Sequence, residues 1–275
     1  MRAPRMPEPL TLLVDNGSLE PAATLALRGL AVRLSGRLGR PVAPVSLLHS
    51  SGIDPQKLGG EPAEILFPSL ERRLAAGQND FILLPLFFGP SRALTEYLPE
   101  NLVRLRQKFP ALRLKLAPPL HAARDNRLAQ ILAQHVRDEL DPSGADRVAL
   151  VDHGSPVAVV TAVRDELAQQ LSGLLGSRVA AVEPASMERR AGPEYDFCQP
   201  LLADLLAAPP WNSGRVIVAM QFLLPGRHAG PAGDVAEICR AAEAAAPGLR
   251  TVMTKLVAEH PLLIDILADR WRQAG

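Results

Sequence analysis

The stretch LLVDNGSLEP at residues 12–21 recurs with few changes as ALVDHGSPVA at residues 149–158. Aligning Asp15 with Asp152 sets an offset of 137 residues between the two halves of the chain. Two further pairs follow at an offset of 135, namely LLPLFFGPSRAL (83–94) with VAMQFLLPGRHA (218–229) and NRLAQILAQHV (126–136) with PLLIDILADRW (261–271). Repetition on this scale indicates a duplicated fold with one copy in each half.

Each half contains four short apolar runs that alternate with helical patterns. The runs are TLLVDN (11–16), PVAPVSLL (41–48), FILLPLFF (81–88) and LRLKLAP (112–118), then RVALVDH (147–153), RVAAVEP (178–184), RVIVAMQF (215–222) and RTVMTKLV (250–257). Continuously apolar runs separated by helices are typical of parallel strands buried on both faces. The sequence therefore predicts an α/β fold of two similar lobes, each an open, mostly parallel four-stranded sheet flanked by helices. The stretch DELDPSGADR (138–147), with Pro142 and Gly144 as breakers, is the expected linker between lobes 1–140 and 147–275.

The composition and net charge favour a globular protein and give no sign of a nucleic-acid partner or a membrane span. A chain of 275 residues with 47% hydrophobic and 21% charged residues has enough apolar side chains for a packed core. The formal net charge of +1 gives no argument for a nucleic-acid partner. There is no run of 18 apolar residues, and the start MRAPRMPEPL turns polar too soon for a signal peptide. We therefore expect a cytoplasmic protein without a membrane span, with Cys198 and Cys239 as free thiols.

In open parallel sheets, ligands bind beyond the carboxyl ends of the strands. In the second half these ends carry His153, Glu188 and His228, with His260 after the fourth strand. Two or three imidazoles and a carboxylate at one edge suit transient binding of a divalent transition metal. The matching positions of the first half hold Asn16, Ala93 and Asp125, with His49 opposite Glu188 if LLHS (47–50) pairs with SMER (186–189). That half has therefore lost the imidazoles that match His153, His228 and His260. We expect His121 and His135 to be solvated or hydrogen-bonded, and the sequence leaves the role of His260 open.

The DHGS segment (152–155) does not fit the pattern of a hydrolase triad. Asp152 and His153 are neighbours at a strand end, so their side chains point to opposite faces and the aspartate cannot orient that histidine. The sequence has no GxSxG elbow. Ser155 is expected to cap the following helix, and Gly154 to let the backbone approach a ligand closely. The segment GPAGD (230–234) lacks a phosphate-loop pattern, which indicates a Gly-rich rim.

The residues VDHGS (151–155), Glu188, LLPGRH (223–228) and HPLL (260–263) resemble those of a known family. This is the class II tetrapyrrole chelatases, and within it the CbiX/SirB-type sirohydrochlorin chelatases in their long, two-lobed form. The resemblance implies a metal-chelating lyase that inserts Co²⁺ or Fe²⁺ into sirohydrochlorin in cobalamin or siroheme biosynthesis. It implies that His153 and His228 are the catalytic and metal-binding histidines and Glu188 the assisting carboxylate, with Glu183 as a less favoured alternative. The first lobe, with Asn16 and Ala93, then looks like a degenerate copy that supplies the opposite wall.

The chemistry of metal insertion agrees with this resemblance. Two pyrrole N–H protons must leave while the metal exchanges water for ring nitrogens, which requires a base near neutral pH and a weak metal holder. A carboxylate-rich macrocycle also needs cationic groups, and arginine pairs with carboxylates in a bidentate manner. The predicted substrate-binding residues are Gly154, Ser155, Arg227, Arg189 and Arg92, with Arg190 beside them.

The expected partners are the tetrapyrrole and a divalent metal ion that acts as substrate. We expect no tightly bound cofactor, no nucleic acid, no membrane and a monomeric state. The alternative function is a metal or tetrapyrrole carrier without turnover, because half of the duplicated set is gone. The complete trio of the second half favours the enzyme, and the sequence leaves open whether the metal is cobalt, iron or nickel.

Overall fold

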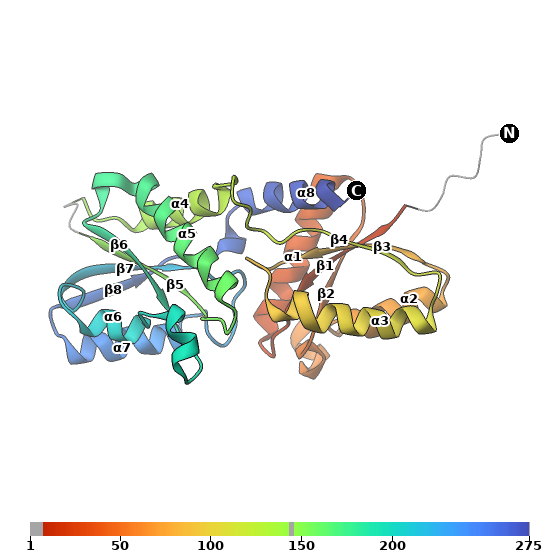
Figure 1. Ribbon diagram of the computed structural model, residues 1–275, viewed down its shortest axis with the longest axis horizontal. Coiled ribbons are helices and arrows are strands. Elements are labelled where there is room, and N and C mark those ends of the chain that lie inside the picture. The colour runs from red at the N-terminus through yellow and green to blue at the C-terminus, as the bar shows by residue number, and fades with distance from the viewer. Residues whose placement is uncertain (1–7, 143–145, 275) are drawn as a thin grey trace. The chain divides into compact units, whose positions relative to one another are not determined.

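The protein, seen here as a computed structural model that describes residues 8–142 and 146–274, contains two four-stranded sheets in which every strand pairs in parallel (Figure 1). The first has the order β2-β1-β3-β4 and the second the order β6-β5-β7-β8. The strands are β1 (Leu10–Asp15), β2 (Val42–Ser46), β3 (Asp80–Pro85), β4 (Arg113–Leu116), β5 (Arg147–Asp152), β6 (Ala181–Ser186), β7 (Gly214–Met220) and β8 (Leu249–Met253). The predicted α/β fold with a duplicated parallel sheet is confirmed. Gly144 of the expected linker lies outside the described residues.

The repeated motif comes from the central part of each sheet. β1 pairs with both β2 and β3, and β5 pairs with both β6 and β7. Both strands are buried along almost their whole length, because helices cover both faces of each sheet. The residue that follows each strand, Asn16 or His153, therefore emerges at the middle of the carboxyl edge, where the fold places ligands.

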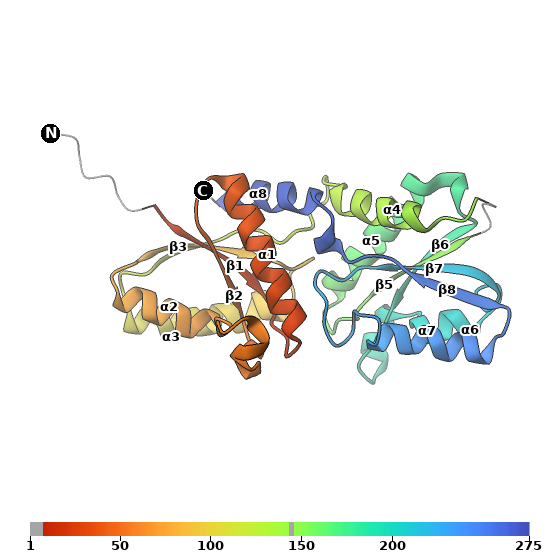
Figure 2. The ribbon, with the colours of Figure 1, turned by 180° about the vertical axis from the view of Figure 1, so that it is seen from behind.

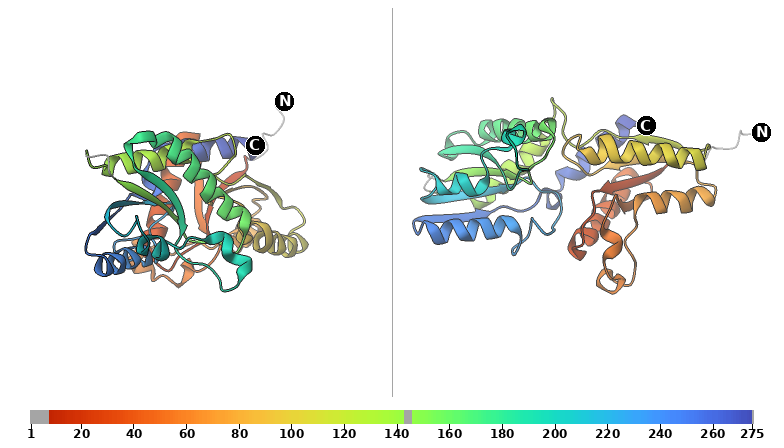
Figure 3. Two further views of the ribbon diagram at one scale, coloured as in Figure 1. Left: turned by 60° about the vertical axis from the view of Figure 1, so that its left-hand side comes forward. Right: turned by 60° about the horizontal axis from the view of Figure 1, so that its bottom comes forward.

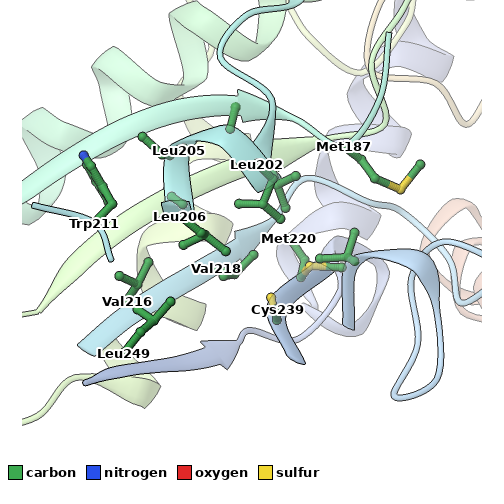
Figure 4. Close-up of a cluster of buried hydrophobic side chains, with 14 of the residues drawn as sticks. Met187, Leu202, Leu205, Leu206, Trp211, Val216, Val218, Met220, Cys239 and Leu249 are labelled. Atoms are coloured by element: carbon green, nitrogen blue, oxygen red, sulfur yellow. The ribbon is translucent and has the colours of Figure 1, made fainter. Parts of the chain in front are cut away.

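In the second sheet, α6 (Leu202–Ala207) and α7 (Asp234–Ala245) cover one face, while α4 (Arg127–Glu139) and α5 (Ala158–Leu175) lie on the other (Figures 2 and 3). Figure 4 shows the core under α6 and α7, in which Leu202 and Leu206 meet Val218 of β7. Met187 and Met220 close this core at the carboxyl end of the strands, and each is followed directly by a polar residue of the edge. The packed core thus fixes the backbone on which the edge residues stand.

The first sheet has the same layers. α2 (Leu66–Ala75) and α3 (Leu98–Lys108) bury their leucines against one face, in a core that continues into β1, β2 and β3. α1 (Pro21–Leu38) packs against β1 and β2. Its buried residues recur at helical spacing, namely Ala23, Leu27, Leu30, Ala31 and Leu34. The helical pattern read from the sequence at this place is therefore confirmed.

The fourth helix of each half packs against the other half's sheet, which the repeat did not indicate. The chain forms two compact units, Met1–Leu120 with Ile264–Gly275, and His121–Leu263. α4 belongs to the second unit and packs on α5 and β7, while α8 (Leu262–Ala274) enters the first. There the Trp271 Nε1–H donates to Thr11 Oγ1 at 2.8 Å, and Arg270 Nη2 donates to the Leu120 carbonyl at 2.7 Å.

These units differ from the lobes 1–140 and 147–275 expected from the repeat. The physical reason is that an amphipathic helix can cover any apolar sheet face, so its own periodicity does not choose between two similar sheets. Among the described residues, no helix combines the length and the apolar character that crossing a membrane requires.

Candidate active site

The first residue of the site, His153, follows β5 directly. The hydrogen bonds between β5 and β6 continue past both strands, from Met187 N–H to Asp152 O at 2.8 Å and from Glu188 N–H to His153 O at 3.2 Å. Gly154 stands in the left-handed region with φ of +89°, and a Cβ there would lie 1.8 Å from the Glu188 carbonyl oxygen. Only glycine allows this approach, so the turn holds His153 and Glu188 side by side.

His228 lies in the loop between β7 and α7, and backbone contacts tie it to the start of α7. The Val235 N–H donates to the His228 carbonyl at 3.3 Å, and the Asp234 N–H donates to the Arg227 carbonyl at 3.3 Å. Gly233 packs so closely that a Cβ there would lie 2.8 Å from the His228 carbonyl oxygen. The Gly-rich rim predicted from the sequence is thus a hydrogen-bonded turn that presents His228.

The structure brings all three predicted catalytic residues together. The His153 and His228 rings meet edge to face, with centroids 4.6 Å apart and planes at 78°. The His153 Nε2 lies 3.6 Å from Glu188 Oε1. The side chains of His153, Glu188 and His228 are 47%, 60% and 31% exposed, so all three are open to solvent and to a ligand. Glu183, the less favoured alternative, lies within β6 beside Ala149, away from the strand ends.

Each imidazole uses its Nδ1 atom for a contact within the protein. The His153 Nδ1 lies 2.9 Å from the Gly154 carbonyl oxygen, and the His228 Nδ1 lies 2.6 Å from Asp234 Oδ2. A carbonyl oxygen only accepts hydrogen bonds, so the His153 Nδ1 carries a proton, and in the neutral ring the lone pair is on Nε2, the atom nearest Glu188. No pattern in the sequence indicated a role for Asp234, although this residue ends the GPAGD segment, six residues after His228.

A buried polar network supports the His153 turn from below. Asp152 Oδ1 accepts hydrogen bonds from the Ser186 hydroxyl at 2.7 Å and from the Gly154 N–H at 3.1 Å. The Arg164 guanidinium, 1% exposed, donates to Ser186 Oγ at 2.6 Å and to the Cys198 carbonyl at 3.0 Å. Burial raises the pKa of Asp152, and the Ser186 hydrogen bond and the Arg164 charge oppose that rise. Asp152 thus holds the turn through Gly154, which bears out the expectation that it does not orient the His153 ring.

Two details of the turn differ from expectation. Ser155 does not cap the helix, because α5 begins at Ala158 and its N-cap residue, Val157, makes no side-chain cap. The Ser155 hydroxyl instead accepts from the Val157 N–H at 3.1 Å, which closes a local turn. Gly154 permits a close backbone approach as predicted, but its neighbour is the Glu188 carbonyl. Binding of a substrate by Gly154 and Ser155 stays a prediction.

The arginines expected to bind substrate carboxylates differ in their surroundings. Arg189 Nη1 forms an ion pair with Asp196 at 3.0 Å and donates to the Gly192 carbonyl at 2.9 Å. The Arg227 side chain is 80% exposed, and its Nε lies 3.8 Å from Asp234 Oδ2. Arg190 is exposed. In the first unit, Arg92 forms a long ion pair with Glu96 at 3.6 Å. Arg227 is therefore the least constrained of the ion-paired candidates.

The other histidines of the second unit do not join the trio. His260 lies against His135, with ring centroids 5.5 Å apart, and its Nδ1 accepts the Leu262 N–H at 3.1 Å. Burial lowers the pKa of both imidazoles, and for His135 the neighbouring His260 adds to that effect. His135 is buried and hydrogen-bonded to the Lys255 backbone, and His121 pairs with Glu166 at 3.2 Å, so neither ring departs from the expectation of a solvated or hydrogen-bonded histidine.

The corresponding edge of the first unit keeps the turn without the chemistry. The Leu48 N–H donates to the Asn16 carbonyl at 3.1 Å, and a Cβ on Gly17 would lie 1.8 Å from the Leu48 carbonyl oxygen. Leu48 therefore corresponds to Glu188, so the pairing of His49 with Glu188 expected from the sequence was wrong by one residue. Ala93 begins a short π-helical turn, η3 (Ala93–Tyr97), at the position that matches His228.

The chemistry of the donor set suits an ion that is held briefly. Two imidazoles and one carboxylate are ligands that suit divalent transition metals such as Co²⁺ and Fe²⁺. Because the site is partly exposed, it leaves room for water or a second ligand on the metal. Within residues 8–142 and 146–274, no group of three or more His, Cys, Asp or Glu side chains is arranged as a metal-holding cluster.

Comparison with known proteins points to one family. The CbiX family model matches residues 147–274, which hold the whole trio. No curated protein matches the sequence. Among solved structures, SirB from Bacillus subtilis with Fe³⁺ superposes with a TM-score of 0.70 at 18% identity, covering 97% of this chain and 95% of that one.

Two further solved structures share the fold. The sirohydrochlorin chelatase SirB from Bacillus subtilis subspecies spizizenii in complex with cobalt gives a TM-score of 0.68 at 16% identity, with coverage of 97% and 95%. CbiX, the terminal enzyme of siroheme biosynthesis in denitrifying bacteria, gives 0.59 at 18% identity, with coverage of 97% and 99%. The protein therefore has the two-sheet fold of these chelatases over nearly its whole length.

Proposed function

We propose that the protein, whose residues 147–274 match the CbiX family model, is a sirohydrochlorin chelatase that inserts cobalt or iron for siroheme or cobalamin biosynthesis. The observation that carries the proposal is the meeting of His153, Glu188 and His228 at one strand edge, with the rings 4.6 Å apart and the carboxylate 3.6 Å from Nε2. The SirB structures with Fe³⁺ and with cobalt, which share this fold, support a metal ion as the inorganic substrate.

The residues have distinct tasks in such a reaction. His153 and His228, whose rings meet with centroids 4.6 Å apart, hold the divalent ion weakly while it keeps some of its water, and they accept protons from the macrocycle. Glu188, 3.6 Å from the His153 Nε2, assists as a proton relay. As the metal bonds to the ring nitrogens, two pyrrole N–H protons leave, so the site needs two acceptors or one acceptor that passes protons to solvent. Glu188, 60% exposed, connects the site to water.

The substrate's carboxylates require cations at the rim of the site. Arg227 is the best placed, because its side chain is 80% exposed and lies next to His228 in the chain. Arg189 already forms an ion pair with Asp196, so its contribution to substrate binding is expected to be smaller. At the same edge the Ser155 hydroxyl, which accepts from the Val157 N–H, still has a proton to donate to the substrate. Gly154, whose N–H and carbonyl face Asp152 and His153, contributes by holding the turn.

The test is the absorbance change of metal-free sirohydrochlorin mixed with Co²⁺ or Fe²⁺, with and without the protein. We expect an accelerated spectral shift that falls by more than about 100-fold in His153→Ala and in His228→Ala, since each removes an acid–base or ligand group. Asn16→Ala, at the position of the first unit that matches His153, is the control and should keep the rate. Light scattering of the same preparation should give the molar mass of a monomer, 29.5 kDa, because one chain already carries both copies of the fold.

Two outcomes would contradict the proposal. Full activity in both histidine variants would remove these residues from the mechanism. Saturable binding of the tetrapyrrole without any acceleration would favour the carrier function, which the loss of the first unit's imidazoles left open.

A further inference from the structure

The most specific contact of the site is one that the proposed metal insertion does not require by itself. The Asp234 carboxylate lies 2.6 Å from the His228 Nδ1, which is the shortest contact that any of the three site residues makes with a side chain. Asp234 is the first residue of α7, and the backbone bonds from Asp234 to Arg227 and from Val235 to His228 fix both partners on one rigid turn. The pair is 31% and 35% exposed.

An ionised carboxylate has no proton to donate, so a hydrogen bond at this distance places the proton on His228 Nδ1. The lone pair of the neutral ring is then on Nε2. We infer that Asp234 is a positioning residue that fixes the tautomer and the orientation of His228, so that Nε2 can take a pyrrole proton or a metal ion. The inference rests on the proposed chelatase function for its catalytic consequence, but the tautomer is a property of the protein alone.

His153 reaches the same tautomer by a different route, since its Nδ1 faces the Gly154 carbonyl at 2.9 Å. Both rings therefore direct Nδ1 at the protein and leave Nε2 for the reaction. Carboxylate partners of this kind orient functional histidines in metal sites. The protein thus uses a backbone carbonyl for one ring and a dedicated side chain for the other.

The first unit supplies an independent comparison. At the offset of 135 residues that aligns Ala93 with His228, Asp234 matches Pro99, the second residue of α3. Proline has no side-chain acceptor, so the carboxylate is absent from the same copy of the fold that lacks the imidazole. This agrees with a role for Asp234 through His228.

A purely structural role must be separated from positioning. An acidic residue in the first turn of a helix stabilises the helix through its dipole, and α7 has two of them, Asp234 and Glu237. Glu237 is exposed and lies one turn further along α7. Glu237→Ala therefore removes the same charge from the same helix end without touching His228, and it is the matched control for Asp234→Ala.

The experiment is a long-range ¹H–¹⁵N correlation spectrum of the metal-free, substrate-free protein labelled at histidine nitrogen, at a pH where the rings are neutral. His228→Gln assigns the His228 signals. In the wild-type protein and in Glu237→Ala we expect a protonated Nδ1 and an unprotonated Nε2. In Asp234→Ala the pattern should shift toward Nε2–H, which free imidazoles prefer, and kcat for insertion should fall about 10- to 100-fold.

An Nε2–H tautomer in the wild-type protein would overturn the inference even if the Asp234 variant failed to fold. An Asp234→Ala protein with altered tautomer and unchanged kcat would overturn the positioning role. Failure of the proposed function gives a different result, because a protein without chelatase activity would still show Nδ1–H in the wild type and lose it in Asp234→Ala.

Discussion

The two units of the chain keep the same turn after their central strands and put different side chains on it. In both, a glycine with φ near +90° lets the backbone approach a carbonyl oxygen to a distance at which a Cβ would clash, at Leu48 in the first unit and at Glu188 in the second. The flanking residues are Asn16 and Leu48 in one unit and His153 and Glu188 in the other. The turn is therefore a requirement of the fold, and the chemistry is a separate property of the residues it carries.

The support beneath the turn also differs between the units. In the second unit Asp152 accepts from Ser186, which in turn accepts from the buried Arg164. In the first unit, Leu27 occupies the position that matches Arg164 at the offset of 137. Asp15 is left with a buried Oδ1 that has no hydrogen-bond partner among the described residues. The unit that carries the trio thus also has the better-compensated carboxylate.

The largest expected effect comes from adding one methyl group to each turn. Gly154→Ala and Gly17→Ala meet the same obstruction, a carbonyl oxygen 1.8 Å from the new Cβ, at a φ that disfavours side chains. Each should lower the free energy of unfolding by at least about 2 kcal/mol. Only Gly154→Ala also displaces His153 from Glu188, so it should reduce metal insertion by more than about 100-fold.

Urea denaturation and the insertion rate, both measured well below the unfolding midpoint, separate the two effects. Equal loss of activity in the two variants would show that the first unit's turn contributes to catalysis as much as the second's, and the comparison between the units would fail.

The next effect concerns pH. Burial raises the pKa of Asp15 to about 6, against opposing hydrogen bonds from Ser46 and Gly17. Between the unfolded value of 3.8 and about 6, the folded state binds more protons than the unfolded state, so stability falls as pH rises through this window. The full shift corresponds to up to about 3 kcal/mol at pH 7. Asp15→Asn should flatten this slope and unfold at higher urea than the wild type at pH 7.

Denaturation of both proteins at pH 5, 6 and 7 tests this. The difference between them isolates Asp15, because Asp152, whose pKa burial also raises, is present in both. A pH slope that is the same in wild type and variant would mean that Asp15 is solvated or paired in the folded protein.

The sequence carried enough information for the strands, the duplication and the trio, because continuous apolar runs reveal buried parallel strands and strand ends share one edge. It did not reveal Asp234, since nothing in a Gly- and Pro-rich segment indicates which residue turns back toward His228. The sequence left open whether His260 belongs to the site. The reason is that β8 lies at the edge of the sheet and His260 follows only after a further turn, η6 (Val257–Glu259). The exchanged fourth helices depend on contacts such as Trp271 with Thr11, which are distant in the sequence.

The smallest effect distinguishes two arginines at matching positions. Arg92 and Arg227 correspond at the offset of 135, and both are predicted to bind substrate carboxylates. Arg92 is 48% exposed and has Glu96 as a neighbour at 3.6 Å, whereas Arg227 is 80% exposed and lies beside the histidine of the site. Both guanidinium groups have a carboxylate neighbour at a similar distance, 3.8 Å for Arg227 and 3.6 Å for Arg92, so the difference lies in the greater exposure of Arg227 and its place next to His228. Arg227→Gln should therefore raise KM for the tetrapyrrole several-fold, on the order of 1 kcal/mol of binding, with kcat little changed, and Arg92→Gln should raise it less.

The effect of Arg227→Gln should shrink as salt is added, because exposed charges are screened. A larger rise in KM for Arg92→Gln would mean that the unit without the site histidines provides the main carboxylate contacts, which would sharpen the division of labour between the two copies of the fold.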